Sequence, residues 1–528
     1  MYLRNHCWLV VCGVMLLSAA ATAELQNVEI GGKIETFSGW YTGFFEPDGT
    51  AVRIPAQDLR LRPIGPFGTE SVYRLGDGGH SMAWTEQRTR LHLKADFTDN
   101  VAGFIEFDEI HSWGEGFRSN YLTGVDARGN ADVSLFQAYI DVDQLFSQPL
   151  RLRIGRQEME FGSGWLVGAD PGYNPFVGLS FDAARLTYNQ NNITVDAWWS
   201  KVADLSPVEE DGDIDFYGIY ATWAKSGGKT DAEAPPLVFD VYWMYLRDAQ
   251  GVHDAVTDPG ILSTAHRLGL DDYDVTNLYT AGARTAGTWS AFDWELEVAY
   301  QWGNADALGA LFVPNGGVFG DDRASWDHWG GHASVGYGLD VSYKPHFTLG
   351  GIFYEGEDNR DFSPRYAGSL FARPNASVSF NRLFSSSRED EFMDTSAMSN
   401  LWKAYVEATV APTEKVELRF NVAYLQAFDG FDYPPYVSTG SVDPGRITIA
   451  PDKPWLTKEG AKDIGWQATI GGAYQYSDAL SFELVYSHFF VGDGLRDGVF
   501  VDDTGLLLMG GRGNDDINLV YFLTTLEF

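Results

Sequence analysis

The chain has 528 residues, with 73 acidic and 37 basic side chains and a formal net charge of −36. Aromatic residues make up 15% of it, yet no apolar run of about 18 residues follows the N-terminal region, which excludes helical membrane spans. The acidic balance disfavours a nucleic-acid-binding protein, because such a protein needs clustered positive charge.

Residues 1–23 predict a signal peptide. Arg4 lies in a short basic region, an apolar stretch covers residues 7–17, and Ala21-Thr22-Ala23 is a small-residue cleavage site. Both cysteines, Cys7 and Cys12, lie in this segment, so we expect a mature chain without cysteine. A disulfide framework, a thiolate metal site and covalently attached haem are then excluded. The sequence therefore predicts an exported protein.

The rest of the chain shows apolar and polar residues that alternate with a period of two. Successive side chains of a strand point to opposite faces, so each such segment has one face in an apolar medium and the other in water. Eighteen segments, mostly 10–14 residues long, are predicted as strands. They lie near 28–41, 84–97, 101–112, 131–142, 150–161, 180–189, 193–203, 214–225, 236–247, 275–286, 290–303, 331–342, 347–357, 400–411, 415–427, 463–476, 479–490 and 515–528.

Short and long connections alternate between these segments. Tight-turn residues form the short ones, at 98–100, 189–192, 412–414 and 477–478. The long ones cover 42–83, 113–130, 248–274, 304–330, 358–399, 428–462 and 491–514. We therefore predict an all-β protein: residues 24–528 form one transmembrane antiparallel β-barrel of about 18 strands, with short periplasmic turns and long extracellular loops.

A soluble β-sandwich or a β-solenoid is the alternative fold. A sandwich would not bury only one face of so many long strands, and a solenoid needs a fixed short repeat, which the sequence lacks. The barrel is therefore favoured, because closure removes the unpaired edges that a sheet in lipid cannot tolerate.

The last segment ends on an aromatic residue, and Val520, Phe522, Leu526 and Phe528 share one face of it. This ending resembles the C-terminal signature that the bacterial barrel-assembly machinery reads. We expect that machinery as a partner through Phe528, outer-membrane lipid and lipopolysaccharide as surroundings, and periplasmic export proteins as a further class of partner. The predicted location is the outer membrane of a Gram-negative cell.

Three stretches between residue 84 and about residue 200 resemble a known family. They are Gln87–Leu91 with Asp99–Val101, Phe104–Asp108 and Trp113-Gly114; Leu152–Glu158 with Phe161-Gly162 and Leu166–Gly168; and Ser180–Leu186. The family is the alginate-export family of outer-membrane barrels. The third stretch departs from its pattern, with Leu179 and Ala183 where Arg and Gly are common. The resemblance implies an eighteen-stranded barrel whose lumen passes a polyuronate, and beyond residue 200 it is architectural.

Placing the apolar side chains outward leaves a basic set facing the lumen. It comprises Arg88, Arg90, His92, Lys94, Arg151, Arg153, Arg185, Arg284, Lys403 and Arg419. Fixed positive charge in a narrow pore selects anions, and arginine binds carboxylates bidentately. The resemblance implies such arginines in the conduit at Arg88, Arg90, Arg153 and Arg185. We predict this set as pore-lining anion-selectivity residues. Arg156 alternates outward, so we expect a bulge after Gly155 or a position near the rim.

Acidic residues are expected to oppose these bases across the lumen. They include Glu86, Glu106, Asp108, Asp293, Glu295 and Glu297. The alternative is that acids and bases neutralise one another between neighbouring strands and only hydrate the wall.

The long connections carry most of the acidic excess. Asp271, Asp272 and Asp274 form a weak Ca²⁺ candidate, because Ca²⁺ prefers oxygen ligands, but no EF-hand spacing is present and a solvated surface is the alternative. No other metal and no cofactor is expected. Loop 358–399 is long and mixed in charge, which makes it a candidate for a plug or gate that folds inward.

The sequence contains no G-x-S-x-G, H-E-x-x-H or Walker motif, so no enzyme and no energy coupling are expected. The leading hypothesis is a passive outer-membrane channel that conducts an anionic polysaccharide, an anionic oligosaccharide or another anionic solute. The alternatives are a general diffusion porin for small solutes and the barrel sheath of an outer-membrane redox complex, which would need partner haem proteins.

Overall fold

A computed structural model describes most of the strands and part of the connections. The described residues are 25–42, 50–55, 70–75, 81–114, 133–169, 178–204, 213–225, 237–248, 275–304, 324–356, 376–377, 380–392, 399–428, 455–456, 462–493, 499–501, 508–510 and 516–528. The predicted signal peptide and the Ca²⁺ candidates Asp271, Asp272 and Asp274 lie outside these residues.

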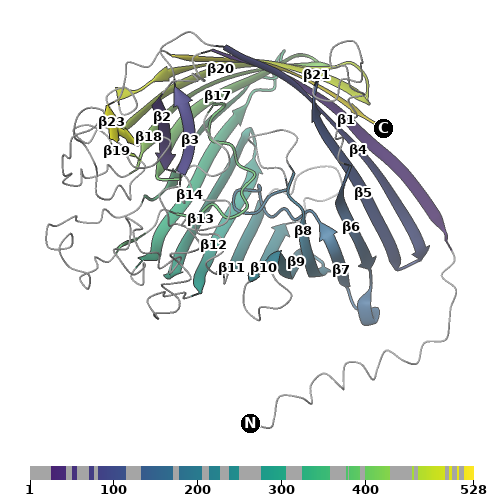
Figure 1. The fold of residues 1–528 in the computed structure, drawn as a ribbon. Helices are drawn as coiled ribbons and strands as arrows, with labels where there is room; N and C mark the ends of the chain where they lie inside the picture. The colour runs from purple at the N-terminus through teal and green to yellow at the C-terminus, as the bar shows by residue number, and fades with distance from the viewer. Residues whose placement is uncertain are drawn as a thin grey trace, which may run out of the picture.

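Long antiparallel strands form a closed barrel (Figure 1), which confirms the predicted fold class. The main sheet has 19 strands; the two-residue β16 (Ala376–Ser377) pairs in parallel with the start of β14, and the other strands make the 18-stranded wall. They are β1 (Asn27–Thr42), β4 (Ser81–Thr98), β5 (Val101–Ser112), β6 (Ser134–Val142), β7 (Leu150–Gln157), β8 (Phe181–Gln190), β9 (Ile193–Asp204), β10 (Asp213–Lys225), β11 (Leu237–Asp248), β12 (Thr276–Trp289), β13 (Phe292–Asn304), β14 (Ala324–Gly338), β15 (His346–Tyr354), β17 (Leu401–Thr413), β18 (Val416–Ala427), β20 (Asp463–Gln475), β21 (Leu480–Val491) and β24 (Ile517–Glu527).

Smaller elements lie outside the wall. They are the hairpin β2 (Thr50–Pro55) and β3 (Glu70–Leu75), the small sheet β19 (Trp455–Leu456), β22 (Val499–Val501) and β23 (Leu508–Gly510), and the 3₁₀ turn η1 (Leu145–Ser147). No helix in the described part of the chain is long and apolar enough to span a membrane.

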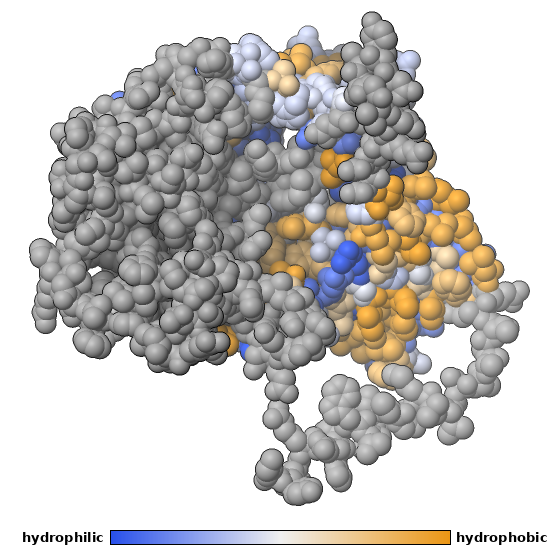
Figure 2. Space-filling model, viewed as in Figure 1, coloured by the Kyte–Doolittle hydropathy of each residue, from blue (hydrophilic) through white to orange (hydrophobic). Residues whose placement is uncertain are grey.

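The barrel wall is apolar outside and polar inside. Leu91 and Leu93 of β4 are 48% and 39% exposed, whereas Arg88 on the opposite face of the same strand is 1% exposed. Figure 2 shows apolar residues predominating over the strands on the right of the view. This surface is stable in lipid because every strand of the wall is paired on both sides, so the backbone groups of each strand form hydrogen bonds within the wall.

The first and last strands close the barrel. β1 pairs with β4 on one side and with β24 on the other, in a continuous register from Lys33–Glu527 to Thr42–Asn518. The amide of Phe528 donates to the carbonyl of Gly32 at 3.0 Å, and the amide of Gly32 donates back at 2.9 Å. A Cβ at Gly32 would lie 2.7 Å from the carbonyl oxygen of Arg90 and 2.8 Å from the Phe528 ring, and because the Arg90 backbone cannot give way this seam requires the glycine.

A β-bulge in β6 changes what faces the lumen. Gln137 pairs with Glu106 and Leu135 with Phe107, so Phe136 is the extra residue of β6. The bulge places the Phe136 ring under the guanidinium groups of Arg90, at 4.4 Å, and Arg88, at 5.1 Å. Bulges commonly re-aim a side chain in this way.

Candidate functional site

Two segments of the chain enter the lumen from long connections. The first inner segment, residues 158–169, follows β7, and the second inner segment, residues 380–392, lies between β16 and β17. They meet at a parallel bridge between Val167 and Phe384. The Phe384 amide donates to the Leu166 carbonyl and the Gly168 amide to the Phe384 carbonyl, both at 2.9 Å. The described part of loop 358–399 therefore folds inward, as the sequence suggested.

Aromatic packing fixes the first inner segment to the wall. Phe161 stacks on Trp198 of β9 at 4.5 Å and on Tyr220 of β10 at 5.1 Å. Trp165 is 2% exposed, and its indole Nε1 donates to the hydroxyl of Tyr354 on β15 at 2.8 Å. Gly164, with a φ of +76°, lets the chain turn between these anchors. Burial of two large aromatic side chains holds this segment in one position.

The second inner segment is attached at both ends. The Asn381 amide donates to Gln301 Oε1 of β13 at 2.7 Å, and Gln301 Nε2 donates back to the Asn381 carbonyl at 2.6 Å. At the other end, Phe392 packs on Phe489 of β21 and Tyr41 of β1 at ring distances of 5.7 and 6.3 Å. Polar and apolar contacts thus tie the segment to opposite parts of the wall.

A buried carboxylate lies between these attachments. Glu389 is fully buried; the Tyr354 hydroxyl donates to its Oε1 at 2.8 Å, Arg382 lies at 3.3 Å and Lys403 Nζ at 3.6 Å. Burial raises the pKa of Glu389, but Lys403 and Arg382 lower it more, so the pKa lies below the ordinary value of 4.5. Glu389 is therefore ionised at neutral pH and is held by two cations.

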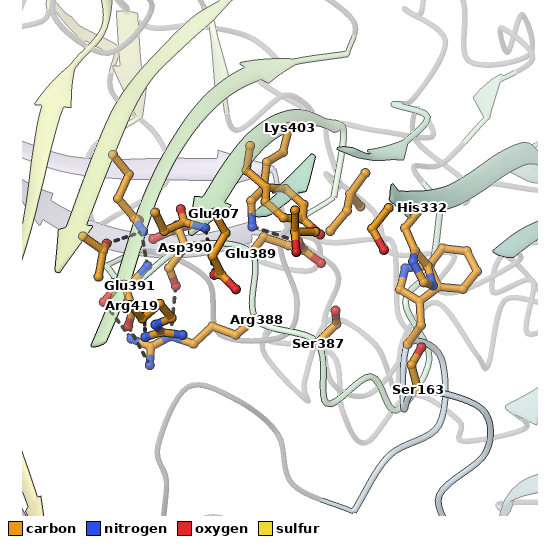
Figure 3. A pocket seen from close by; sticks show the side chains of 18 of the residues that line it. Ser163, His332, Ser387, Arg388, Glu389, Asp390, Glu391, Lys403, Glu407 and Arg419 are labelled. Atoms are coloured by element: carbon orange, nitrogen blue, oxygen red, sulfur yellow. Dashed lines mark hydrogen bonds and ion pairs between the residues drawn. The ribbon is translucent and has the colours of Figure 1, made fainter. Parts of the chain in front are cut away.

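A cavity of about 490 Å³ lies between the second inner segment and the wall (Figure 3). Three cations line it, Arg388, Lys403 and Arg419, together with His332. Six carboxylates also line it: Glu295, Glu389, Asp390, Glu391, Glu407 and Glu483. Six carboxylates against three cations give the lining an acidic excess, although Arg284 and Arg382 compensate Glu295 and Glu389 from outside the lining. Anions that enter this part of the lumen therefore face more carboxylates than cations.

Most of the predicted lumen bases are ion-paired. Eight of the ten lie within 4.0 Å of a carboxylate, namely Arg88, Arg90, Lys94, Arg153, Arg185, Arg284, Lys403 and Arg419. His92 stacks on Phe104 at 5.5 Å. Arg151 makes no ion pair with a described residue. Arg88, Lys94, Arg153, Arg185 and Arg284 pair with acids of neighbouring strands, as neutralisation within the wall would give, whereas Arg90, Lys403 and Arg419 pair with acids of the inner segments.

The strongest of these pairs lie on neighbouring strands. Arg88 donates from Nε and NH2 to Asp108 at 3.0 and 2.9 Å, and both residues are buried. Arg153 donates bidentately to Asp141 at 2.8 and 2.7 Å. Arg185 contacts Asp196 at 2.8 Å. Such bidentate, charge-assisted bonds keep their guanidinium groups from a solute.

The predicted lumen acids occupy several environments. Glu106 accepts from Gln137 at 2.7 Å, Asp293 pairs with His346 at 2.6 Å, and Glu86 lies on β4. Glu295, Glu297 and His332 bring ligand atoms within 4.8 Å of one another, an arrangement that could hold a metal ion. Arg284 already lies 2.7 Å from Glu295 and 3.8 Å from Glu297, so a cation occupies this position.

Arg156 lies on the outer face near the end of β7. It pairs bidentately with Asp182 of β8 at 2.9 and 2.8 Å, and the pairing register of β7 is continuous through Gly155. The near-rim alternative is therefore correct and the expected bulge after Gly155 is wrong, because β7 ends at Gln157 and alternation alone carries Arg156 outward.

The sequence reasoning did not select several residues of this site. Trp165, Tyr354, Arg382 and Glu389 form its centre; of these only Arg382 is noticed from the sequence, as one of the bases of loop 358–399, and none is predicted as a site residue. Glu389 lies in a mixed-charge loop, where a buried acid has no periodic signal, and Trp165 follows a segment that alternates like a strand. Only the inward course of the two segments brings them together.

A family match covers most of the chain. Residues 70–504 match the family described as Alginate export. Among solved structures, OpdQ of Pseudomonas aeruginosa is 9% identical with a TM-score of 0.47, covering 96% of this chain and 99% of that chain. OccK8 (OprE) of the same organism is 10% identical with a TM-score of 0.47, covering 95% and 98%. No curated protein matches the chain. Because the family match covers most of a chain that closes into an eighteen-stranded barrel, the protein belongs to the alginate-export family of outer-membrane β-barrels.

Proposed function

We propose that this passive outer-membrane channel conducts anionic solutes, with anionic oligosaccharides among them. The observation that supports this is a group of loosely compensated cations on the lumen face of β4 and β7, close to the short-turn rim. Lys94 is 46% exposed in its side chain and its nearest carboxylates are Glu29 at 3.9 Å and Asp96 at 4.0 Å. Arg151 makes no ion pair within the described part of the chain, and His92 lies on the same face. Family membership supports the same class of cargo.

A planar-bilayer measurement tests this function. The reversal potential in a KCl gradient gives the permeability ratio of Cl⁻ to K⁺, and added oligouronate tests for block. We expect the wild type to prefer Cl⁻ and the double variant Lys94→Ala/Arg151→Ala to lose most of that preference, because fixed cations raise the local anion concentration.

Arg156→Ala is the matched control. It removes an arginine from the same strand, β7, but from the outer face, where the side chain pairs with Asp182. Its permeability ratio should equal that of the wild type. A wild-type preference for K⁺ together with no block by oligouronate would contradict the proposal.

The second candidate is a general diffusion porin for small solutes. Two observations favour it: eight predicted lumen bases are already paired, and two inner segments occupy part of the lumen beside a cavity of about 490 Å³. Liposome swelling with glucose and glucuronate separates the candidates, because the two sugars differ in charge and hardly in size. Equal swelling rates favour the porin, and faster entry of glucuronate favours the anion channel.

A redox sheath has less support. A barrel that encloses a partner protein needs an open lumen, whereas here the two inner segments pack against the wall through Phe161, Trp165 and Phe392.

A further inference from the structure

Two arginines enclose one carboxylate at the edge of the cavity. NH1 of Arg388 lies 3.2 Å from Glu391 Oε2, and NH2 of Arg419 lies 3.6 Å from Glu391 Oε1 (Figure 3). Arg388 and Glu391 belong to the second inner segment, whereas Arg419 projects from β18. All three side chains line the cavity.

The surroundings of this carboxylate hold their places without its side chain. Arg388 Nε donates to the carbonyl of Asp390 at 2.9 Å, and NH2 donates to the carbonyl of Glu391 at 2.7 Å. The Glu391 amide donates to Gln467 Oε1 at 2.9 Å, and the next residue, Phe392, is buried. The main chain is therefore anchored on both sides, and only the Glu391 side chain has to rotate for the space between the arginines to open.

The ion pairs of Glu391 are longer than the cross-strand pairs of the wall and more exposed than those of Glu389. Arg153 and Asp141 approach to 2.7 Å and Arg185 and Asp196 to 2.8 Å, against 3.2 and 3.6 Å here, and the Glu391 side chain is 13% exposed whereas that of Glu389 is fully buried. Among the described residues Glu391 Oε2 accepts no hydrogen bond, and the side chain of Arg419 is 36% exposed. Another carboxylate can therefore compete for these guanidinium groups, which bind carboxylates well when the geometry is bidentate.

We propose that Arg388 and Arg419 form a carboxylate-binding site of the lumen, that Glu391 is its built-in occupant, and that a uronate solute binds by exchange with the Glu391 side chain. This inference rests on the proposed conduction of anions and names the residues that contact the cargo.

The exchange explains how an anion can use a cavity whose lining carries more carboxylates than cations. An anion added beside Glu391 would meet repulsion from that carboxylate and its acidic neighbours, whereas an anion that replaces Glu391 takes over contacts already made for a carboxylate. Because the internal carboxylate returns when the solute leaves, binding stays weak. Weak binding suits a channel, since a solute must leave as readily as it enters.

Equilibrium binding of glucuronate to the full-length, detergent-solubilised protein tests the proposal by calorimetry. Glu391→Gln should bind glucuronate roughly tenfold more tightly than the wild type, the gain expected when one charge-assisted contact no longer has to be replaced. Glu407→Gln is the matched control: it removes another carboxylate of the same cavity, one that accepts a hydrogen bond from the side-chain amide of Asn421 at 3.1 Å. Its affinity should change by less than about twofold.

Two further variants keep the test decisive. Glu391→Gln/Arg419→Gln should lose the gain, and Glu391→Asp, which keeps the charge but retracts it from both arginines, should bind with intermediate affinity even if Glu391→Gln folds poorly. Equal gains in Glu391→Gln and Glu407→Gln would reduce the effect to net charge and overturn the proposal. A gain that survives loss of Arg419 would overturn it as well. The readout is binding rather than conduction. A wild-type channel without anion preference would therefore contradict the proposed function, whereas only the binding results above contradict the carboxylate-binding site.

Discussion

Val167 and Phe384 form a parallel bridge inside the lumen, although they belong to the β7–β8 and β15–β17 connections, which lie across the barrel from each other. Through this bridge the two inner segments become one unit, so that neither can leave the lumen without breaking contacts of the other.

A disulfide should lock the two inner segments together. A Cβ at position 164 would lie 3.6 Å from the Cβ of Ser386, within the range of disulfides, so Gly164→Cys/Ser386→Cys should oxidise readily. The φ of +76° at Gly164 strains a cysteine there by about 1–3 kcal/mol, which the cross-link must offset. Thiol titration before and after oxidation measures closure, with Ser386→Cys alone as the control.

The conductance of the oxidised double variant shows whether the two inner segments have to separate for the channel to open. If the inner segments stay in the lumen while ions pass, the oxidised and reduced channels should conduct equally. A conductance that rises only on reduction would show that the segments separate when the channel opens, and failure to oxidise would contradict the bridge itself. The predicted absence of other cysteines from the mature chain makes the readout clean.

Trp165→Ala should loosen the inner segments. The indole is buried against Tyr354 and Phe380, and its removal should cost the attachment about 3–5 kcal/mol, as large-to-small changes in packed sites do. We expect a larger and noisier single-channel conductance. Trp289→Ala, which changes an exposed tryptophan at the end of β12, should leave the conductance unchanged.

Arg88→Ala should destabilise the barrel rather than change its selectivity. The variant leaves the buried Asp108 without its cation, which typically costs about 3–5 kcal/mol. The gel shift between folded and heat-unfolded barrel should move to a lower temperature. Arg88→Met/Asp108→Leu removes both charges and should recover most of the loss; a destabilisation that persists in the double variant would show that packing on Phe136 matters more than the ion pair.

Lowering the pH should weaken the attachment of the second inner segment only when the pH falls below the ordinary pKa of glutamate. The pKa of Glu389 is lowered in the folded state, so its stabilising effect is present above the unfolded pKa and is lost as the pH falls through the folded one. The conductance should be constant from pH 7 to about pH 5 and should rise below about pH 4.5. Glu389→Gln should remove that rise; a wild-type transition near pH 6 would contradict the assignment.

The sequence predicts the wall well and the lumen poorly. All eighteen strand segments exist, because a lipid-facing strand must alternate along its whole length, as Phe292–Asn304 does. The predicted segment 150–161 nevertheless ends at Gln157. Met159 and Phe161 continue the alternation, but they pack against the inner wall, and an apolar residue has the same sequence signal whether it faces lipid or a lumen partner.

The lumen charges show a second limit of sequence reasoning. Alternation places Arg88 and Arg419 correctly on the inner face, yet it says nothing of their partners. Arg88 finds Asp108 on the adjacent strand, whereas Arg419 finds Glu391 on a segment that arrives from a long loop. Cross-strand pairs follow from register, which neighbouring strands share, but the partner of Arg419 depends on the course of a loop, which no periodicity encodes.

The mutual hydrogen bonds of Gly32 and Phe528 have a consequence for biogenesis. Because β1 completes its pairing only with β24 and Phe528, the cylinder cannot close before β24 has been made. A chain that stops short of β24 would leave two strand edges open in the bilayer, so premature termination should yield material for proteolysis rather than a smaller pore.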